Sequence, residues 1–286
     1  MFKYLAALFM LIDHLGSFLG YAIPPDIVIV MRQIGRLAYP MFAYIVAKNI
    51  DRSSNLPRYF VRLLIAASVT QLIFQALHVI YTHTYIYVNT IFTFALGIAM
   101  VTGLRLIFES SRDMLLMVRP ATNLGEADPD GATGGQIQLP VNFGGVTLPA
   151  WIGSFSGIIL TIIVITTTLL LNPDYGLYGV LMIVVFYFLN KRLPSDTGPF
   201  GKESRFSRTL AYFVALLVLN LFYLWNRSAG GLAHIGQFQM VSTMAVLLFP
   251  LESIREKRPG KFSKRFFYIF YPAHIAILMI ISNYIT

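Results

Sequence analysis

Cysteine is absent from this chain of 286 residues, and charged side chains make up only 12% of it. Without cysteine the protein can form no disulfide bond, thiolate nucleophile, cysteine-bound metal site or acyl-cysteine intermediate. We also find no internal repeat and no glycine-rich phosphate loop, and we expect no metal site. The low charge, the 56% of hydrophobic residues and the mean hydropathy of +0.67 are typical of an integral membrane protein.

Nine apolar runs are long enough, or nearly so, to cross about 30 Å of hydrocarbon at about 1.5 Å per helical residue. They cover residues 2–23, 27–47, 59–80, 86–107, 149–171, 175–190, 207–225, 231–250 and 266–285. The first run begins as a signal peptide does, but Asp13 and His14 interrupt it, so we expect a retained helix. The sequence thus predicts an all-α, polytopic membrane protein with about nine transmembrane helices, forming a single domain over residues 1–286.

The formal net charge of +9 is distributed in a way that indicates membrane topology, and we expect no nucleic-acid partner. Most of the 22 Lys and Arg residues lie at the N-terminal end and in every second connection, whereas the alternate connections hold only Arg227. By the positive-inside rule the N-terminus is cytoplasmic and the C-terminus lies outside. Residues 109–148 are less apolar and include an acidic, glycine-rich stretch at 124–135, which predicts a flexible cytoplasmic insertion.

Asp13 and His14 are adjacent ionisable residues in the middle of the first apolar run. Because an ionisable side chain at mid-bilayer costs about 2.5 to 3.5 kcal/mol on the insertion scale, both are candidates for the chemistry. Arg32 and Arg36, four residues apart in the second run, lie at a similar depth. Asp13 is about 100° around the helix from His14, so we expect it to pair with one of these arginines. The second guanidinium then favours an anion or a carbonyl oxygen.

Two further side chains belong to this arrangement, one at the same level and one at the cytoplasmic end. His274, which follows Tyr271 and Pro272 in the last run, approaches the same level. Lys3 lies about three helical turns before His14, on the same helix face at the cytoplasmic mouth. This arrangement suits a ligand with phosphates at the cytoplasmic surface and a reactive end inside the membrane, such as acyl-coenzyme A. His14 could take a proton from an amine or hydroxyl, or accept the acyl group itself, and both roles stay open.

Four stretches resemble the signature stretches of the TraX family: residues 13–16, 34–43, 174–179 and 267–274. The resemblance runs from the first apolar run to the last and leaves out mainly residues 109–148. It implies a place in a wider group of transmembrane acyltransferases that includes the acyltransferase-3 enzymes. It also implies acetyl or acyl transfer from cytoplasmic coenzyme A at a bacterial cytoplasmic membrane, with pilin N-acetylation as the activity that gives the family its label.

The acyltransferase-3 enzymes have a basic residue and a histidine in their first helix, which Lys3 and His14 resemble. They also have a paired-arginine motif with two intervening residues, whereas Arg32 and Arg36 have three. We therefore predict an enzyme, a multi-pass membrane acyltransferase that uses acetyl-coenzyme A or another acyl-coenzyme A. His14 is its base or transient acyl carrier, Asp13 pairs with Arg32, and Arg32 and Arg36 hold the thioester or the acceptor.

The remaining candidates are assigned by position. Lys3 steers coenzyme A, and Tyr39, Tyr271 and His274 complete the cofactor side. Asn89 and Thr93 are assigned to the acceptor side, although such groups more often form hydrogen bonds between helices. The acceptor is a pilin-like peptide, a glycan or a lipid, which the sequence does not distinguish.

Three alternatives to this hypothesis stay open. Asp13 and the two arginines could form only a structural ion-pair lock, with the histidines as bystanders. The same buried charges could bind an anionic solute or lipid in a transporter or flippase. The protein could also be a non-catalytic component of an envelope complex.

Overall fold

The computed structural model describes residues 2–53, 55–82, 88–118, 136–138, 147–193, 201–229, 239–253 and 261–285. This part of the chain is helical except for one short antiparallel pair of strands, β1 (Gln136–Gln138) and β2 (Thr147–Pro149). The all-α prediction is therefore confirmed for nearly all described residues. Most of the predicted insertion at 109–148 lies outside the described residues, so its expected flexibility stays a prediction.

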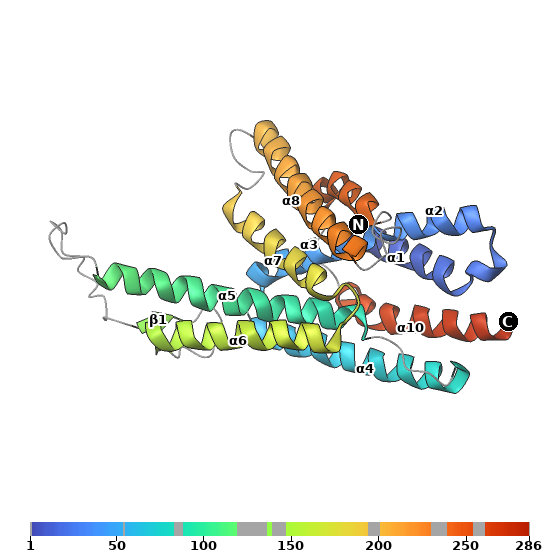
Figure 1. The fold of residues 1–286 in the computed structure, drawn as a ribbon, viewed down its shortest axis with the longest axis horizontal. Helices are drawn as coiled ribbons and strands as arrows, with labels where there is room; N and C mark the ends of the chain where they lie inside the picture. Colours follow the sequence, from blue (N-terminus) through green and yellow to red (C-terminus); the bar gives the residue numbers. More distant parts are fainter. Residues whose placement is uncertain are drawn as a thin grey trace.

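Within the described part of the chain, five helices are long and apolar enough to cross a membrane. They are α4 (Leu56–Thr82), α5 (Thr90–Val118), α6 (Ala150–Leu171), α8 (Gly201–Ala229) and α10 (Lys261–Ile285). In Figure 1, α5 packs along α6 and α4, and α10 lies beside α4. Their outward faces carry exposed apolar side chains such as Leu72 and Leu170, which suits contact with lipid. The predicted total of about nine crossings stays a prediction.

The second predicted span is not a single helix, and here the prediction of one helix over residues 27–47 is wrong. Helix α2 (Pro25–Gly35) ends before Arg36, and α3 (Ala38–Arg52) begins two residues later. Gly35 is a poor helix former, and the Asp13 side chain occupies the space that a Cβ atom at this position would need. Pro40 fits the first turn of α3, where its missing N–H has no helical partner to lose. The helix is therefore interrupted beside Asp13.

Helix α1 (Phe2–Phe18) runs parallel to α10. Near its start the Tyr4 ring lies 5.4 Å from the Phe266 ring, and near its end the Ser282 hydroxyl donates a 2.8 Å hydrogen bond to the Phe18 carbonyl. If both helices cross the bilayer, this parallel arrangement requires an odd total number of crossings, which the predicted nine satisfies. The cytoplasmic location of the N-terminus stays a prediction.

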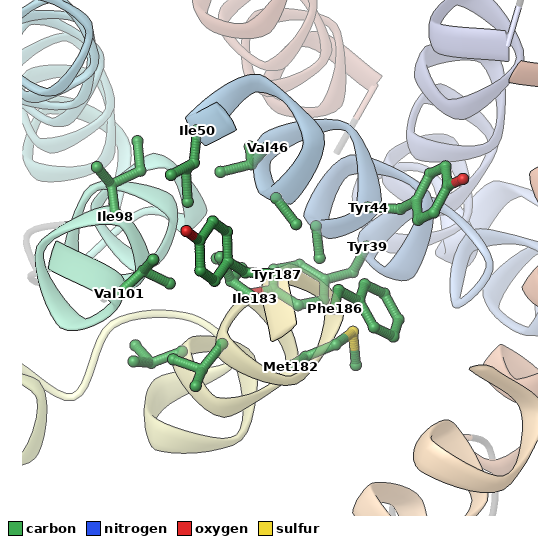
Figure 2. Packing of buried hydrophobic residues seen from close by; sticks show 14 of the residues in the cluster. Tyr39, Tyr44, Val46, Ile50, Ile98, Val101, Met182, Ile183, Phe186 and Tyr187 are labelled. Atoms are coloured by element: carbon green, nitrogen blue, oxygen red, sulfur yellow. The ribbon is translucent and has the colours of Figure 1, made fainter. Parts of the chain in front are cut away.

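The buried core lies where α3, α5 and α7 (Gly176–Arg192) meet. Figure 2 shows Val46 and Ile50 of α3 above Ile183 and Phe186 of α7, with Ile98 of α5 to the left. Although α7 has only 17 residues, most of its first three turns are buried, because α3, α5 and α8 all pack against it. The 3-10 helix η3 (Val241–Ser253) covers α3 and α8. This core fixes α3, so the break before α3 has a defined position.

Candidate functional site

The carboxylate of Asp13 forms an ion pair with Arg32. Nη1 of Arg32 lies 2.9 Å from Oδ2 of Asp13 and also donates to the Asp13 main-chain carbonyl at 3.3 Å. The two side chains are 17% and 33% exposed, so the pair is partly buried. Helices α1 and α2 approach closely enough to form it because Gly16 and Gly35 lie in their interface. The prediction that Asp13 pairs with one of the two arginines is confirmed for Arg32.

Arg36 directly follows the last residue of α2 and is the surplus cation that the sequence indicates. Among the described residues, none accepts a hydrogen bond from its buried Nε, and none donates one to Oδ1 of Asp13. Its guanidinium group lies close enough to interact electrostatically with Asp13, Asp174 and Tyr175. A buried N–H without a partner costs about 1 to 3 kcal/mol, so this site contains one donor and one acceptor that a ligand could satisfy.

His14 contacts His274 of α10 directly. Nδ1 of His14 lies 2.7 Å from Nε2 of His274, and the two rings meet edge to edge, with centroids 5.0 Å apart and planes inclined by 21°. Nδ1 of His274 lies 2.6 Å from the carbonyl oxygen of Phe270 one turn earlier. His14 is half-buried, whereas His274 is only 6% exposed. The sequence places the two histidines at one level, but it has no signal for the hydrogen bond between them.

Tyr39 lies in the first turn of α3 and carries another unsatisfied group. Its ring stacks on the Tyr175 ring at a centroid distance of 3.8 Å and on Phe94 at 5.4 Å. Its hydroxyl group is buried and has no hydrogen-bond partner among the described residues. Arg36 and Tyr39 are three residues apart across the break between α2 and α3, and both lie near Tyr175. The break therefore brings two unpartnered donors to one region.

Asp174 also lies in this region, and the sequence indicates it only as the first residue of the TraX-like stretch 174–179. Its Oδ2 accepts a 2.7 Å hydrogen bond from the Thr90 hydroxyl, and its Oδ1 accepts one from the Tyr175 amide at 3.1 Å. The Tyr271 hydroxyl also lies within hydrogen-bonding reach of Thr90. Tyr175 has a left-handed backbone with φ of 65°, which an aromatic residue rarely adopts. No pattern in the sequence predicts this conformation, although the resemblance includes residues 174–179.

Asn89 and Thr93, assigned to the acceptor side, both have structural partners. Asn89 donates to the Ala67 carbonyl and to Gln71 of α4, and its Oδ1 accepts the Ile91 amide at the start of α5. The Thr93 hydroxyl donates to the main-chain carbonyl of Asp174. These contacts correspond to the interhelical role that was the alternative for both residues.

Lys3 lies in the first turn of α1, as expected, and its Nζ is 5.3 Å from the centroid of the Tyr4 ring. Helix α1 is continuous from Phe2 to Phe18, so Lys3 and His14 lie on one helix about 16 Å apart along its axis. Lys48 and Arg52 of α3 both form ion pairs with Glu252 of η3. Phe2 packs against Tyr44 of α3 and Phe249 of η3, so these cations belong to the same end of the molecule as Lys3.

These features define a polytopic helical membrane protein with ionisable side chains from α1, α2 and α10 gathered at one level. The family model described as TraX protein matches residues 1–123 and 143–282. The chain therefore belongs to the TraX family. The stretch that the family model leaves out, 124–142, falls within the predicted insertion. No curated protein and no solved structure matches the chain.

Proposed function

We propose that this protein is a membrane-bound acyltransferase that moves an acyl group, acetyl in the first place, from cytoplasmic acyl-coenzyme A to an amine or hydroxyl acceptor. The observation that carries the proposal is the group formed by His14, the Asp13–Arg32 pair and the unpartnered Nε of Arg36. Its members come from α1, from α2 and from the break that follows α2. A base and a cationic donor held at one level are what acyl transfer needs.

A purely structural lock explains this group less well. One Asp–Arg pair is complete without a second guanidinium, yet Arg36 is half-buried beside it with its Nε unsatisfied. An unsatisfied donor is costly in the free protein, whereas a thioester carbonyl can accept its hydrogen bond during the reaction. A structural ion pair alone also gives no role to the hydrogen bond between His14 and His274.

The chemistry follows from these positions. His14 takes the proton of the acceptor N–H or O–H while the acceptor atom bonds to the thioester carbonyl carbon. Arg36 stabilises the negative charge that develops on the carbonyl oxygen. The carbon–sulfur bond then breaks, and the coenzyme A thiolate that leaves takes this proton from His14. In the alternative role, His14 bonds to the acyl carbon first and passes the acyl group on.

The donor is expected to enter from the end of the molecule that carries Lys3. Lys48 and Arg52 at this end outnumber their partner Glu252, so the cluster has a net positive charge that suits phosphate groups. The predicted topology places this end in the cytoplasm, in a bacterial cytoplasmic membrane. A kinship with the acyltransferase-3 enzymes is part of the proposal. The family label favours a peptide amine as acceptor, while a glycan hydroxyl or a lipid headgroup is the alternative.

The test compares acetyl-coenzyme A turnover by purified wild-type protein, His14→Ala and His78→Ala, with a short peptide or an oligosaccharide as acceptor. His78 is a half-buried histidine of α4 and serves as the matched control. Loss of the base should lower the rate of thioester cleavage by at least about 100-fold, and the control should stay within about twofold. Coenzyme A should also raise the melting temperature of the wild type.

Two results would contradict the proposal. One is uptake of an anionic solute into proteoliposomes without thioester cleavage, which identifies a transporter. The other is the absence of both thermal shift and turnover with acetyl-coenzyme A, which leaves a non-catalytic envelope component.

A further inference from the structure

The hydrogen bonds around His274 define which nitrogen of each ring carries a proton. The Phe270 carbonyl can only accept, so Nδ1 of His274, 2.6 Å away, must carry a proton. A neutral imidazole has one N–H, which leaves a lone pair on Nε2 of His274. Nδ1 of His14 lies 2.7 Å from this Nε2 and must then be the donor. With both rings neutral, this network assigns the lone pair of His14 to Nε2.

We propose that His274 is a positioning residue that holds His14 in the tautomer with a basic Nε2. The carbonyl of Phe270 orients His274, and His274 orients His14, much as an outer partner orients a histidine that performs chemistry. Among the described residues, Nε2 of His14 has no hydrogen-bond partner, so this lone pair is available to a ligand. His274 itself is assigned no contact with substrate.

The packing around His274 supports a positioning role. Its ring is stacked on Phe270 at a centroid distance of 4.7 Å and meets the His14 ring edge to edge, and only 6% of the residue is exposed. The hydrogen bond between Ser282 and Phe18 joins α10 to α1 about two turns further along. These contacts fix the rotation and height of α10 relative to α1, so the two imidazoles meet in one geometry.

The inference rests on the proposed function and makes it more specific. Whether His14 acts as a base or as an acyl carrier, the reacting atom is Nε2. As a base, Nε2 takes the proton of the acceptor and later passes it to the coenzyme A thiolate, while Nδ1–H stays hydrogen-bonded to His274. The Phe270 carbonyl takes no proton, so His274 keeps its own Nδ1–H and the proton does not leave through this pair.

The test uses two amides that mimic different nitrogens of His274. In His274→Gln the amide oxygen reaches about the place of Nε2 and can still accept from His14, whereas in His274→Asn it reaches only the place of Nδ1. We expect thioester cleavage by His274→Gln to stay within about fivefold of the wild type, and His274→Asn to lose about 10- to 100-fold, as is usual for outer partners. Melting temperatures of both variants identify any loss of folded protein.

A second measurement is independent of activity. The chain has five histidines, so nitrogen NMR of histidine-labelled protein, with His14→Gln to assign the His14 signals, reports its tautomer. We expect the lone pair on Nε2 in the wild type and in His274→Gln, and a shift to the other tautomer in His274→Asn. A protonated Nε2 in the wild type, or equal activity of the Gln and Asn variants, would overturn the inference. An inactive wild type that has the expected tautomer would instead contradict the proposed function alone.

Discussion

Two groups of buried polar side chains in this protein differ in how completely their hydrogen bonds are made. The first lies between α7, α8 and η3. There Asn220 accepts from the Tyr178 hydroxyl at 2.6 Å and donates to Ser242 and Thr243, and Gln239 donates to the same Tyr178. The second lies around the break between α2 and α3, where Arg36 and Tyr39 have buried donors without partners.

This difference separates a structural network from a candidate site. Inside a helix bundle, a saturated network joins helices at little net cost, because every desolvated group regains a partner. Unsatisfied groups lower the stability of the free protein, so they persist where another molecule supplies the missing partner. On this argument the Asn220 network holds α7, α8 and η3 together, and the Arg36 region is the candidate ligand site.

The largest effect that separates the two regions is expected from Arg36→Gln. If Arg36 stabilises charge on the thioester carbonyl, its loss should lower acetyl-coenzyme A turnover by about 100-fold. The melting temperature should change little, because Nε of Arg36 has no protein acceptor among the described residues. The control is Arg192→Gln, at an exposed position at the end of α7, which should leave turnover within about twofold. Destabilisation without any loss of turnover would make Arg36 a structural residue and remove the contrast.

Much of the site could be predicted from the sequence, because the cost of charge in a membrane is visible there. Asp13 needs a cation within reach, and Arg32 is the nearest one on a neighbouring helix, as the structure shows. The excess of two guanidinium groups over one carboxylate also indicates an unpartnered Arg36. These predictions depend only on residue type and on depth along a helix.

Features that depend on helix rotation or on local backbone geometry could not be predicted. The break at Arg36 and Leu37 follows Gly35, but one glycine inside an apolar run does not by itself end a helix. The packing of Asp13 on Gly35 becomes visible only when the helices are in place. The contact between His14 and His274 requires a defined rotation of α1 and α10 about their axes. The polarity of Asn89 is visible in the sequence, but its partners on α4 are not.

A smaller effect, on stability and not on activity, is expected from Asn220→Leu. The substitution keeps the side-chain volume but removes the acceptor of the Tyr178 hydroxyl and the donor to the Thr243 hydroxyl, at a cost of about 2 to 3 kcal/mol in the free energy of unfolding. Turnover per folded molecule should stay near that of the wild type. Leu221→Ala, on an exposed face of the same helix, is the control and should cost less. A loss of turnover as large as that of Arg36→Gln would mean that the network belongs to the site.

The smallest effects, and the most direct test of the comparison, are expected from two Tyr→Phe substitutions, which should change the free energy of unfolding differently. The Tyr178 hydroxyl is hydrogen-bonded to Asn220 and Gln239, so Tyr178→Phe should lower the free energy of unfolding by about 1 to 2 kcal/mol. The buried Tyr39 hydroxyl has no partner among the described residues, so Tyr39→Phe should leave that free energy unchanged or raise it by up to about 1 kcal/mol. If the Tyr39 hydroxyl bonds to the acyl donor, Tyr39→Phe should also lower turnover by about tenfold, equivalent to about 1.4 kcal/mol. Denaturant unfolding of both variants, together with acetyl-coenzyme A turnover, measures both quantities. Equal destabilisation by the two substitutions would show that Tyr39 is as structural as Tyr178, and the ligand would then need to be sought at Arg36 alone.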